Sequence, residues 1–108
     1  MYSYSATIGR NVGETPMTLT LWEQFIEDVT SDMTSTASDT YEAVEIHRGK
    51  GSWQGIEEES AKITMLLRSA LPEEGERSLS VLRGYLSENA RQYGQDAIAL
   101  TIGVSELC

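Results

Sequence analysis

The strongest local pattern in the sequence is a short apolar run in the middle of the chain. Residues 61–68, AKITMLLR, place apolar side chains at every second position from Ile63 to Leu67. An acidic cluster precedes the run and Pro72 follows it closely, so the segment has the length of a strand rather than a helix. We therefore predict a strand here, at the centre of a sheet.

Three other segments have the two-residue period of half-buried strands. Residues 2–8 and 97–104 alternate apolar with small or polar side chains, and residues 41–48 do so less regularly. In the least regular segment, the two predicted faces are Val44 and Ile46 against Glu45 and His47.

Two segments have helical spacing. Thr20, with Glu23 three residues later, forms a capping-box pattern, and apolar residues then recur at helical spacing up to Met33. Residues 31–40, SDMTSTASDT, have little to bury, so we expect the helix to fray into a loop there. A second helix is predicted to begin at acidic residues and to end at Gly94. Its apolar stripe is Leu79, Leu82, Leu86, Ala90 and Tyr93.

Glycines mark two predicted turn regions. Residues 9–16 carry Gly9, Gly13 and Pro16 and predict a loop. Residues 49–55, GKGSWQG, predict a turn that carries one large aromatic side chain.

The order of predicted elements is strand, helix, strand, strand, helix, strand. Two right-handed crossovers joined by a hairpin predict a ferredoxin-like βαββαβ domain over residues 1–108, an α+β fold with a four-stranded antiparallel sheet and both helices on one face. The first and third strands would be central. The open face of the sheet would then carry Ser3, Ser5, Thr7, Glu45, His47, Lys62, Thr64, Ala99 and Thr101.

The balance of charge limits the partners. Eight basic and seventeen acidic side chains give a net charge of -9, which repels nucleic acid and anionic membranes. The first residues lack the pattern of a secretory signal, and no apolar run has membrane-spanning length. We therefore expect a cytoplasmic protein that binds neither nucleic acid nor membrane.

The sequence predicts no metal site and no cofactor. Cys108 is the single cysteine and His47 the single histidine, so a Cys/His zinc site cannot form. No Asp-rich calcium loop is present either.

Several local features resemble a family of small uncharacterised bacterial and phage proteins, known as a domain of unknown function. They are Gly9-Arg10-Asn11, Trp22-x-x-Phe25, Gly51-x-Trp53, Glu59-Ser60-x-Lys62 and Tyr93-Gly94-Gln95. The resemblance implies a compact α/β domain and no established activity. Residues 31–40 form an insert relative to the family pattern.

Three residues are candidates for binding a small ligand. Arg10 and Asn11 follow the first strand, where the Arg10 side chain and backbone amides could contact an anion. The neighbouring Gly9 and Gly13 are equally explained by a tight turn. His47 shares the predicted open face with Glu45 and Lys62. These residues are either an acid/base group or part of a solvated surface.

Acidic residues and one tryptophan are candidates for binding a protein. The acidic residues form a solvated face or a docking surface for a basic partner, and Trp53 either caps the core or stands out as an anchor. The candidates are Glu23, Glu27, Asp28, Asp32, Trp53, Glu57, Glu58 and Glu59.

Two functional hypotheses follow. The first is a non-enzymatic acidic module that binds a protein with a basic surface, such as a phage-encoded, anti-CRISPR-type inhibitor of a host defence or nucleic-acid-processing protein. The small polar face also suggests a homodimer, formed by sheet stacking or edge pairing. The alternative is a small-molecule binder or cofactor-independent enzyme with a pocket near Arg10, His47 and Trp53.

Overall fold

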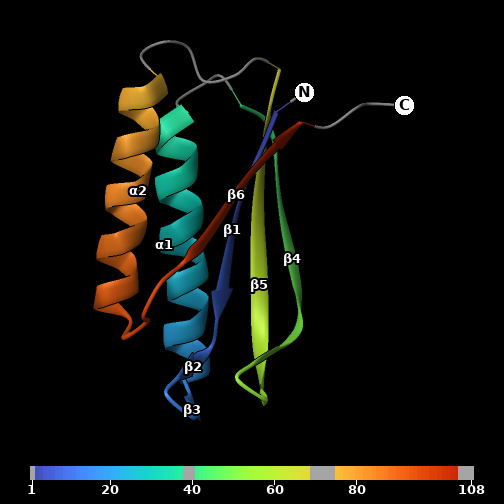
Figure 1. Cartoon of the computed structure of the whole chain (residues 1–108), viewed down its shortest axis with the longest axis vertical. Helices are drawn as coiled ribbons and strands as arrows, with labels where there is room; N and C mark the ends of the chain where they lie inside the picture. The colour runs from blue at the N-terminus through green and yellow to red at the C-terminus, as the bar shows by residue number, and fades with distance from the viewer. Residues whose placement is uncertain (1, 38–40, 69–74, 105–108) are drawn as a thin grey trace.

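The computed structural model describes residues 2–37, 41–68 and 75–104, without the side chains of residues 53 and 75–78. Its long strands and both helices run roughly along the long axis of the molecule in Figure 1. The elements are β1 (Tyr2–Gly9), β2 (Asn11–Val12), β3 (Thr15–Pro16), α1 (Leu19–Ala37), β4 (Tyr41–Trp53), β5 (Ile56–Leu67), α2 (Gly75–Gln92) and β6 (Ala99–Val104).

The main sheet is antiparallel, with the strand order β4-β5-β1-β6. The prediction of an α+β fold with two helices and a four-stranded antiparallel sheet is confirmed. Strand β5 contains the apolar run and is central, and its Ile63 and Met65 are fully buried. The short β2–β3 hairpin forms a separate two-stranded sheet. This hairpin lies in the predicted loop, so the element order differs from the predicted βαββαβ.

The strand register confirms the predicted faces of the sheet. Tyr4 lies opposite both Met65 of β5 and Ile102 of β6, which places apolar side chains of neighbouring strands on one face. On the other face, the Ser5 and Thr64 hydroxyls are 2.9 Å apart and share a hydrogen bond. The open face is therefore small and polar near its centre.

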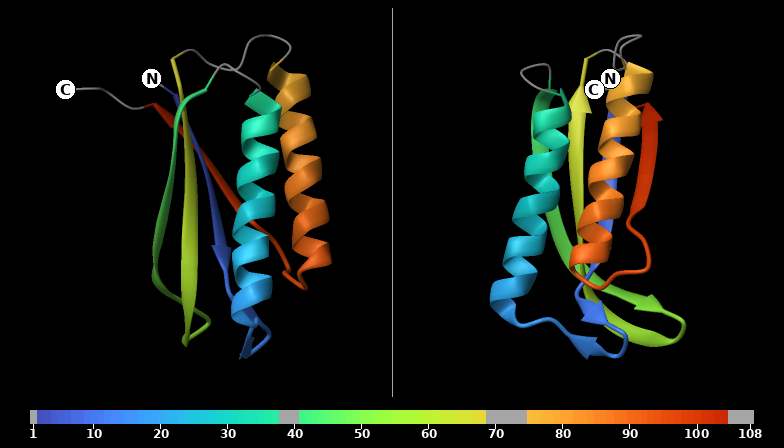
Figure 2. Two further views of the ribbon diagram at one scale, coloured as in Figure 1. Left: turned by 180° about the vertical axis from the view of Figure 1, so that it is seen from behind. Right: turned by 90° about the vertical axis from the view of Figure 1, so that its left-hand side faces the viewer.

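The two helices cover the apolar face, side by side (Figure 2). Phe25 of α1 stacks on Tyr93, just beyond α2, with ring centroids 4.5 Å apart. Leu82 and Leu86 of the predicted α2 stripe are buried, and Gly94 has a φ of 68°, which suits the end of a helix. Neither described helix is long and apolar enough to cross a membrane.

The prediction that α1 frays after residue 31 is wrong, because α1 continues to Ala37. Met33 and Ala37 are buried, so this part of the helix does have apolar surface to cover. The Thr30 and Thr36 hydroxyls donate to carbonyl oxygens four residues earlier, at 2.7 and 2.8 Å. The first helical turn hydrogen-bonds to residue 18 rather than starting from the predicted cap at residue 20.

The predicted turn over residues 49–55 is wrong except at its end. Strand β4 continues to Trp53 and pairs with β5 along its length, and the turn is only Gln54 and Gly55. Both turn residues have positive φ, 52° and 81°, as a type I′ hairpin turn requires. The register shifts between Tyr41 and Ala43, so the irregular alternation in this strand reflects a bulge.

Candidate functional site

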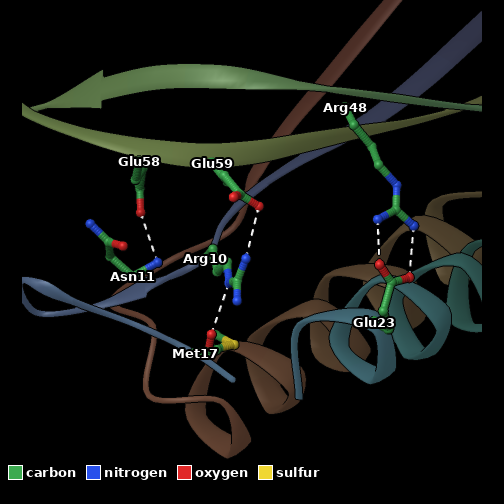
Figure 3. A network of polar contacts seen from close by, with 7 residues as sticks. All are labelled: Arg10, Asn11, Met17, Glu23, Arg48, Glu58 and Glu59. Carbon is green, nitrogen blue, oxygen red and sulfur yellow. Dashed lines mark hydrogen bonds and ion pairs between the residues drawn. The ribbon is translucent and has the colours of Figure 1, made fainter. Parts of the chain in front are cut away.

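The turn after β1 is held against the beginning of β5 (Figure 3). The Arg10 amide donates to the Glu59 carbonyl at 2.9 Å. The Arg10 guanidinium donates to the Met17 carbonyl at 2.8 Å and to the Glu59 carboxylate at 3.0 Å. Arg10 is therefore occupied in joining β1, the β2–β3 hairpin and β5.

Glu58 lies on the other side of this turn. Its Oε2 accepts the Asn11 amide at 3.0 Å. Its carboxylate also lies where a side chain on Gly9 would be, since a Cβ there would be 2.4 Å from Glu58 Oε1. Glycine at this position thus admits the carboxylate against the backbone. Within the described ranges, Glu58 forms no ion pair with a basic side chain, unlike Glu59.

Glycines leave the open face bare beside Glu58. Ser60 lies opposite Gly9 on one side and Gly49 on the other, and the next position of β4, Gly51, lies opposite Glu58. We call Gly9, Gly49, Gly51 and Ser60 the glycine shelf. A Cβ added to Gly49 would meet no atom within 4 Å. At Gly49 the shelf therefore offers open backbone on which a flat ring could lie, whereas the Glu58 carboxylate lies over Gly9.

Charged side chains border the shelf at both ends. Glu58 lies at the hairpin end, and His47 faces Lys62 across β4 and β5 at the other. Positions 58 and 62 are about 13 Å apart along the strand at ~3.3 Å per residue. The shelf thus suits a ligand with a planar part and a positive charge that reaches Glu58.

The structure separates His47 from Arg10. His47 is exposed on the open face, 3.1 Å from the Glu45 carboxylate, whereas Arg10 reaches the buried Met17 on the helix side. The Trp53 side chain lies outside the described part of the chain. Two cavities in the described part of the chain are lined by neither Arg10 nor His47. The pocket near Arg10, His47 and Trp53 stays a prediction.

Glu23, one of the predicted partner-binding carboxylates, pairs within the fold. It accepts two hydrogen bonds from Arg48 of β4, at 2.5 and 2.7 Å (Figure 3). The hydrogen bonds from Arg48 lower the pKa of Glu23. This pair joins α1 to the edge strand of the sheet.

Asp28 and Asp32 lie between the helices. Asp28 accepts the Tyr93 hydroxyl at 2.5 Å, and Asp32 accepts the Asn89 amide. Burial and the neighbouring Asp28 raise the pKa of Tyr93 to about 12, and burial raises the pKa of Asp32. These carboxylates hold the helices together, and sequence reasoning missed that role.

The remaining acidic candidates are more open to solvent. Glu27 and Glu57 are exposed, and Glu57 is 3.8 Å from Lys50. The predicted acidic residues therefore do not form one free surface. No three or more His, Cys, Asp or Glu side chains within the described ranges are placed to hold a metal ion.

Sequence reasoning also missed the glycine shelf. The signal was present in Gly49 and Gly51, which are two residues apart and so fall on one face of a strand. The same glycines read equally well as a turn, and only the pairing of β4 with β5 separates the two interpretations.

No protein-family model and no curated protein matches the chain. Solved structures that share its fold include the following two. A phage SAM lyase in its apo state superposes with a TM-score of 0.59 and 18% identity, covering 94% of this chain and 78% of that one. A phage SAM lyase in complex with S-methyl-5'-thioadenosine gives a TM-score of 0.54 and 20% identity, covering 94% and 79%.

Proposed function

We propose that this chain binds S-adenosylmethionine on the glycine shelf and cleaves it to S-methyl-5'-thioadenosine. The observation that carries the proposal is the half-buried Glu58 carboxylate, held beside bare backbone by the Asn11 amide. The likeness in fold to a phage SAM lyase, over 94% of the chain, supports this choice of ligand.

The chemistry needs no co-reactant. An oxygen of the substrate's own carboxylate attacks the carbon bonded to the sulfonium, and the electron pair of the broken carbon–sulfur bond goes to sulfur. The products are neutral S-methyl-5'-thioadenosine and homoserine lactone, whose ammonium keeps the single net positive charge. The protein then has to bind the substrate folded, with the attacking oxygen close to that carbon.

Glu58 would hold the substrate's ammonium. That charge persists through the reaction, whereas the sulfonium charge disappears, so a carboxylate at the sulfur would oppose cleavage. The adenine and ribose would lie on the shelf, where glycines let a ligand approach the backbone closely. Fixing both ends of the substrate restricts it to conformations close to reaction.

The test is to incubate the purified protein with S-adenosylmethionine and to follow S-methyl-5'-thioadenosine by liquid chromatography. We expect formation above the protein-free rate. We expect no 5'-thioadenosine from S-adenosylhomocysteine, because breaking the same bond there would release a thiolate, a poorer leaving group than a neutral thioether. No product above that rate, together with no binding of S-adenosylmethionine by calorimetry, would overturn the proposal.

Glu58→Gln tests the role of the carboxylate. A hydrogen bond between charged groups contributes about 1.5–3 kcal/mol, so affinity for S-adenosylmethionine should fall about 10- to 100-fold. S-methyl-5'-thioadenosine lacks the ammonium, so its affinity should stay unchanged. The matched control is Glu57→Gln, which removes the same charge from an exposed position next along β5. Equal losses for both ligands would refute the ammonium assignment.

Docking on a basic protein, as a phage-encoded inhibitor would do, is a second proposal. Its support is the net charge of -9 together with the exposed Glu27 and Glu57. Such binding should weaken with salt, because exposed charges are screened over about 8 Å at physiological ionic strength. Binding that is indifferent to salt would remove this proposal.

For the fold we propose a ferredoxin-like arrangement with the β2–β3 hairpin inserted before α1. The central position of β1 and β5 supports this proposal. An experimental structure with a different strand order would contradict it.

A further inference from the structure

The two edges of the main sheet differ in chemistry. Strand β4 carries charged side chains on both faces, and it has a bulge near its start. Strand β6, Ala99–Val104, has the sequence ALTIGV, with no charge and no proline. Charges, prolines and bulges are the usual means of preventing an edge strand from pairing with another chain. Strand β6 has none of these.

The helix-facing side of β6 also leaves apolar side chains exposed. Ile102 is 44% exposed and Val104 is 76% exposed, although their β1 neighbours Tyr4 and Tyr2 are more deeply buried. Figure 1 shows why, since β6 runs diagonally away from α2 toward its C-terminal end. A groove of about 650 Å³ lies between the two elements, lined in part by Leu86 and Leu100.

We infer that β6 is a self-association surface, where it pairs antiparallel with β6 of a second copy of this chain. A two-fold axis perpendicular to the sheet keeps the helices of both copies on one face. In such a pair, the side chains of directly opposite residues point to the same face of the sheet. This holds when Ile102 of one copy lies opposite Ile102 of the other. That register places Val104 of each copy opposite Leu100 of the other, at the groove.

The uncharged sequence of β6 is what suits a second copy as the occupant. Two chains of net charge -9 repel one another, and a contact confined to an uncharged strand keeps that repulsion small. Pairing β6 with itself brings no like charges into contact and covers the apolar side chains of both copies. One strand pair and its flanking side chains bury less than the ~800 Å² per partner of a standard interface, so we expect dissociation in the micromolar range.

This inference does not rest on the proposed function. The glycine shelf lies on the open face toward β4, whereas β6 is the opposite edge. Substrate cleavage and self-association can therefore succeed or fail separately.

The test is sedimentation equilibrium over a range of micromolar concentrations, with two variants that add the same charge to the same strand. Val104→Lys places an ammonium on the helix-facing side at a position that is 76% exposed in the single chain. Thr101→Lys is the matched control on the open face, where it is also exposed. We expect dimers for the wild type and for Thr101→Lys, and monomers for Val104→Lys.

Three results would overturn the inference: a monomeric wild type, loss of the dimer with Thr101→Lys, or a dimer that survives Val104→Lys. Loss with Thr101→Lys alone would indicate sheet stacking instead. Circular dichroism should show both variants folded. A second measurement needs no variant, because hydrogen exchange of the amides in residues 99–104 should slow as wild-type concentration rises. Exchange independent of concentration would likewise contradict edge pairing.

Discussion

The contact between Gly9 and Glu58 can be tested by Gly9→Ala. Gly9 does not have a positive φ, so its backbone conformation is compatible with alanine. Its Cβ would nevertheless lie 2.4 Å from Glu58 Oε1 and 2.6 Å from the carboxyl carbon, far inside van der Waals contact. The Glu58 side chain must move, and we expect its hydrogen bond from the Asn11 amide to break.

The cost can be worked from this lost bond. A hydrogen bond to a charged acceptor contributes about 1.5–3 kcal/mol, and water reaching the half-exposed Asn11 reduces the loss to roughly 1–2 kcal/mol. Alanine also restricts the unfolded chain, which stabilises the fold by about 0.4–1 kcal/mol. The net loss is about 1 kcal/mol, or a melting temperature lower by about 4–8 °C for a domain of this size.

A double-mutant cycle makes the prediction specific. In a Glu58→Ala background there is no carboxylate to displace, so Gly9→Ala should stabilise the protein by about 0.4–1 kcal/mol. Urea denaturation of the four proteins gives the coupling energy, expected at about 1–2 kcal/mol. An equal cost of Gly9→Ala in both backgrounds would refute this account of the glycine.

Three further predictions concern the glycine shelf and the polar contacts between the two helices. Gly49→Leu should abolish binding of S-adenosylmethionine in calorimetry without lowering the melting temperature, because its Cβ meets no atom within 4 Å; a lower melting temperature would contradict the open shelf. Tyr93 should ionise near its pKa of about 12, visible as a late phenolate absorbance step that Tyr93→Phe removes. Burial raises the pKa of Asp32 in the folded chain, so ionisation of this carboxyl opposes folding. The stability of the wild type should therefore fall as pH rises from the ordinary pKa of the unfolded chain to the raised pKa of the folded chain. Asp32→Asn, which can still accept from Asn89, should flatten that slope in urea titrations at several pH values; an unchanged slope would refute the assignment.

The prediction from sequence succeeded where the signal is local. Alternation in β1 and β5 identified which side chains face the helices, because successive residues of any strand point to opposite faces. The spacing of Leu82 and Leu86 likewise identified the buried side of α2, since residues four apart share one side of a helix. These periodicities do not depend on what the element packs against.

The prediction failed where the local sequence is compatible with two structures of similar energy. Threonines in residues 31–37 disfavour a helix in isolation, yet burial of Met33 and Ala37 extends α1 through them. Gly49 and Gly51 suit a turn or a strand, and pairing with β5 makes them a strand. In both cases the deciding contact comes from a distant part of the chain.

The alternating faces of the strands, the apolar stripe of α2, the class of the fold and the excess of negative charge were determined by the sequence alone. Only the tertiary structure decided what each acidic side chain does. Asp28 meets Tyr93 across 65 residues of chain, and Glu58 meets the Asn11 amide across 47. The carboxylates look alike in sequence, because a carboxylate's role depends on which donors, backbone or solvent surround it, and packing brings those neighbours from elsewhere in the chain.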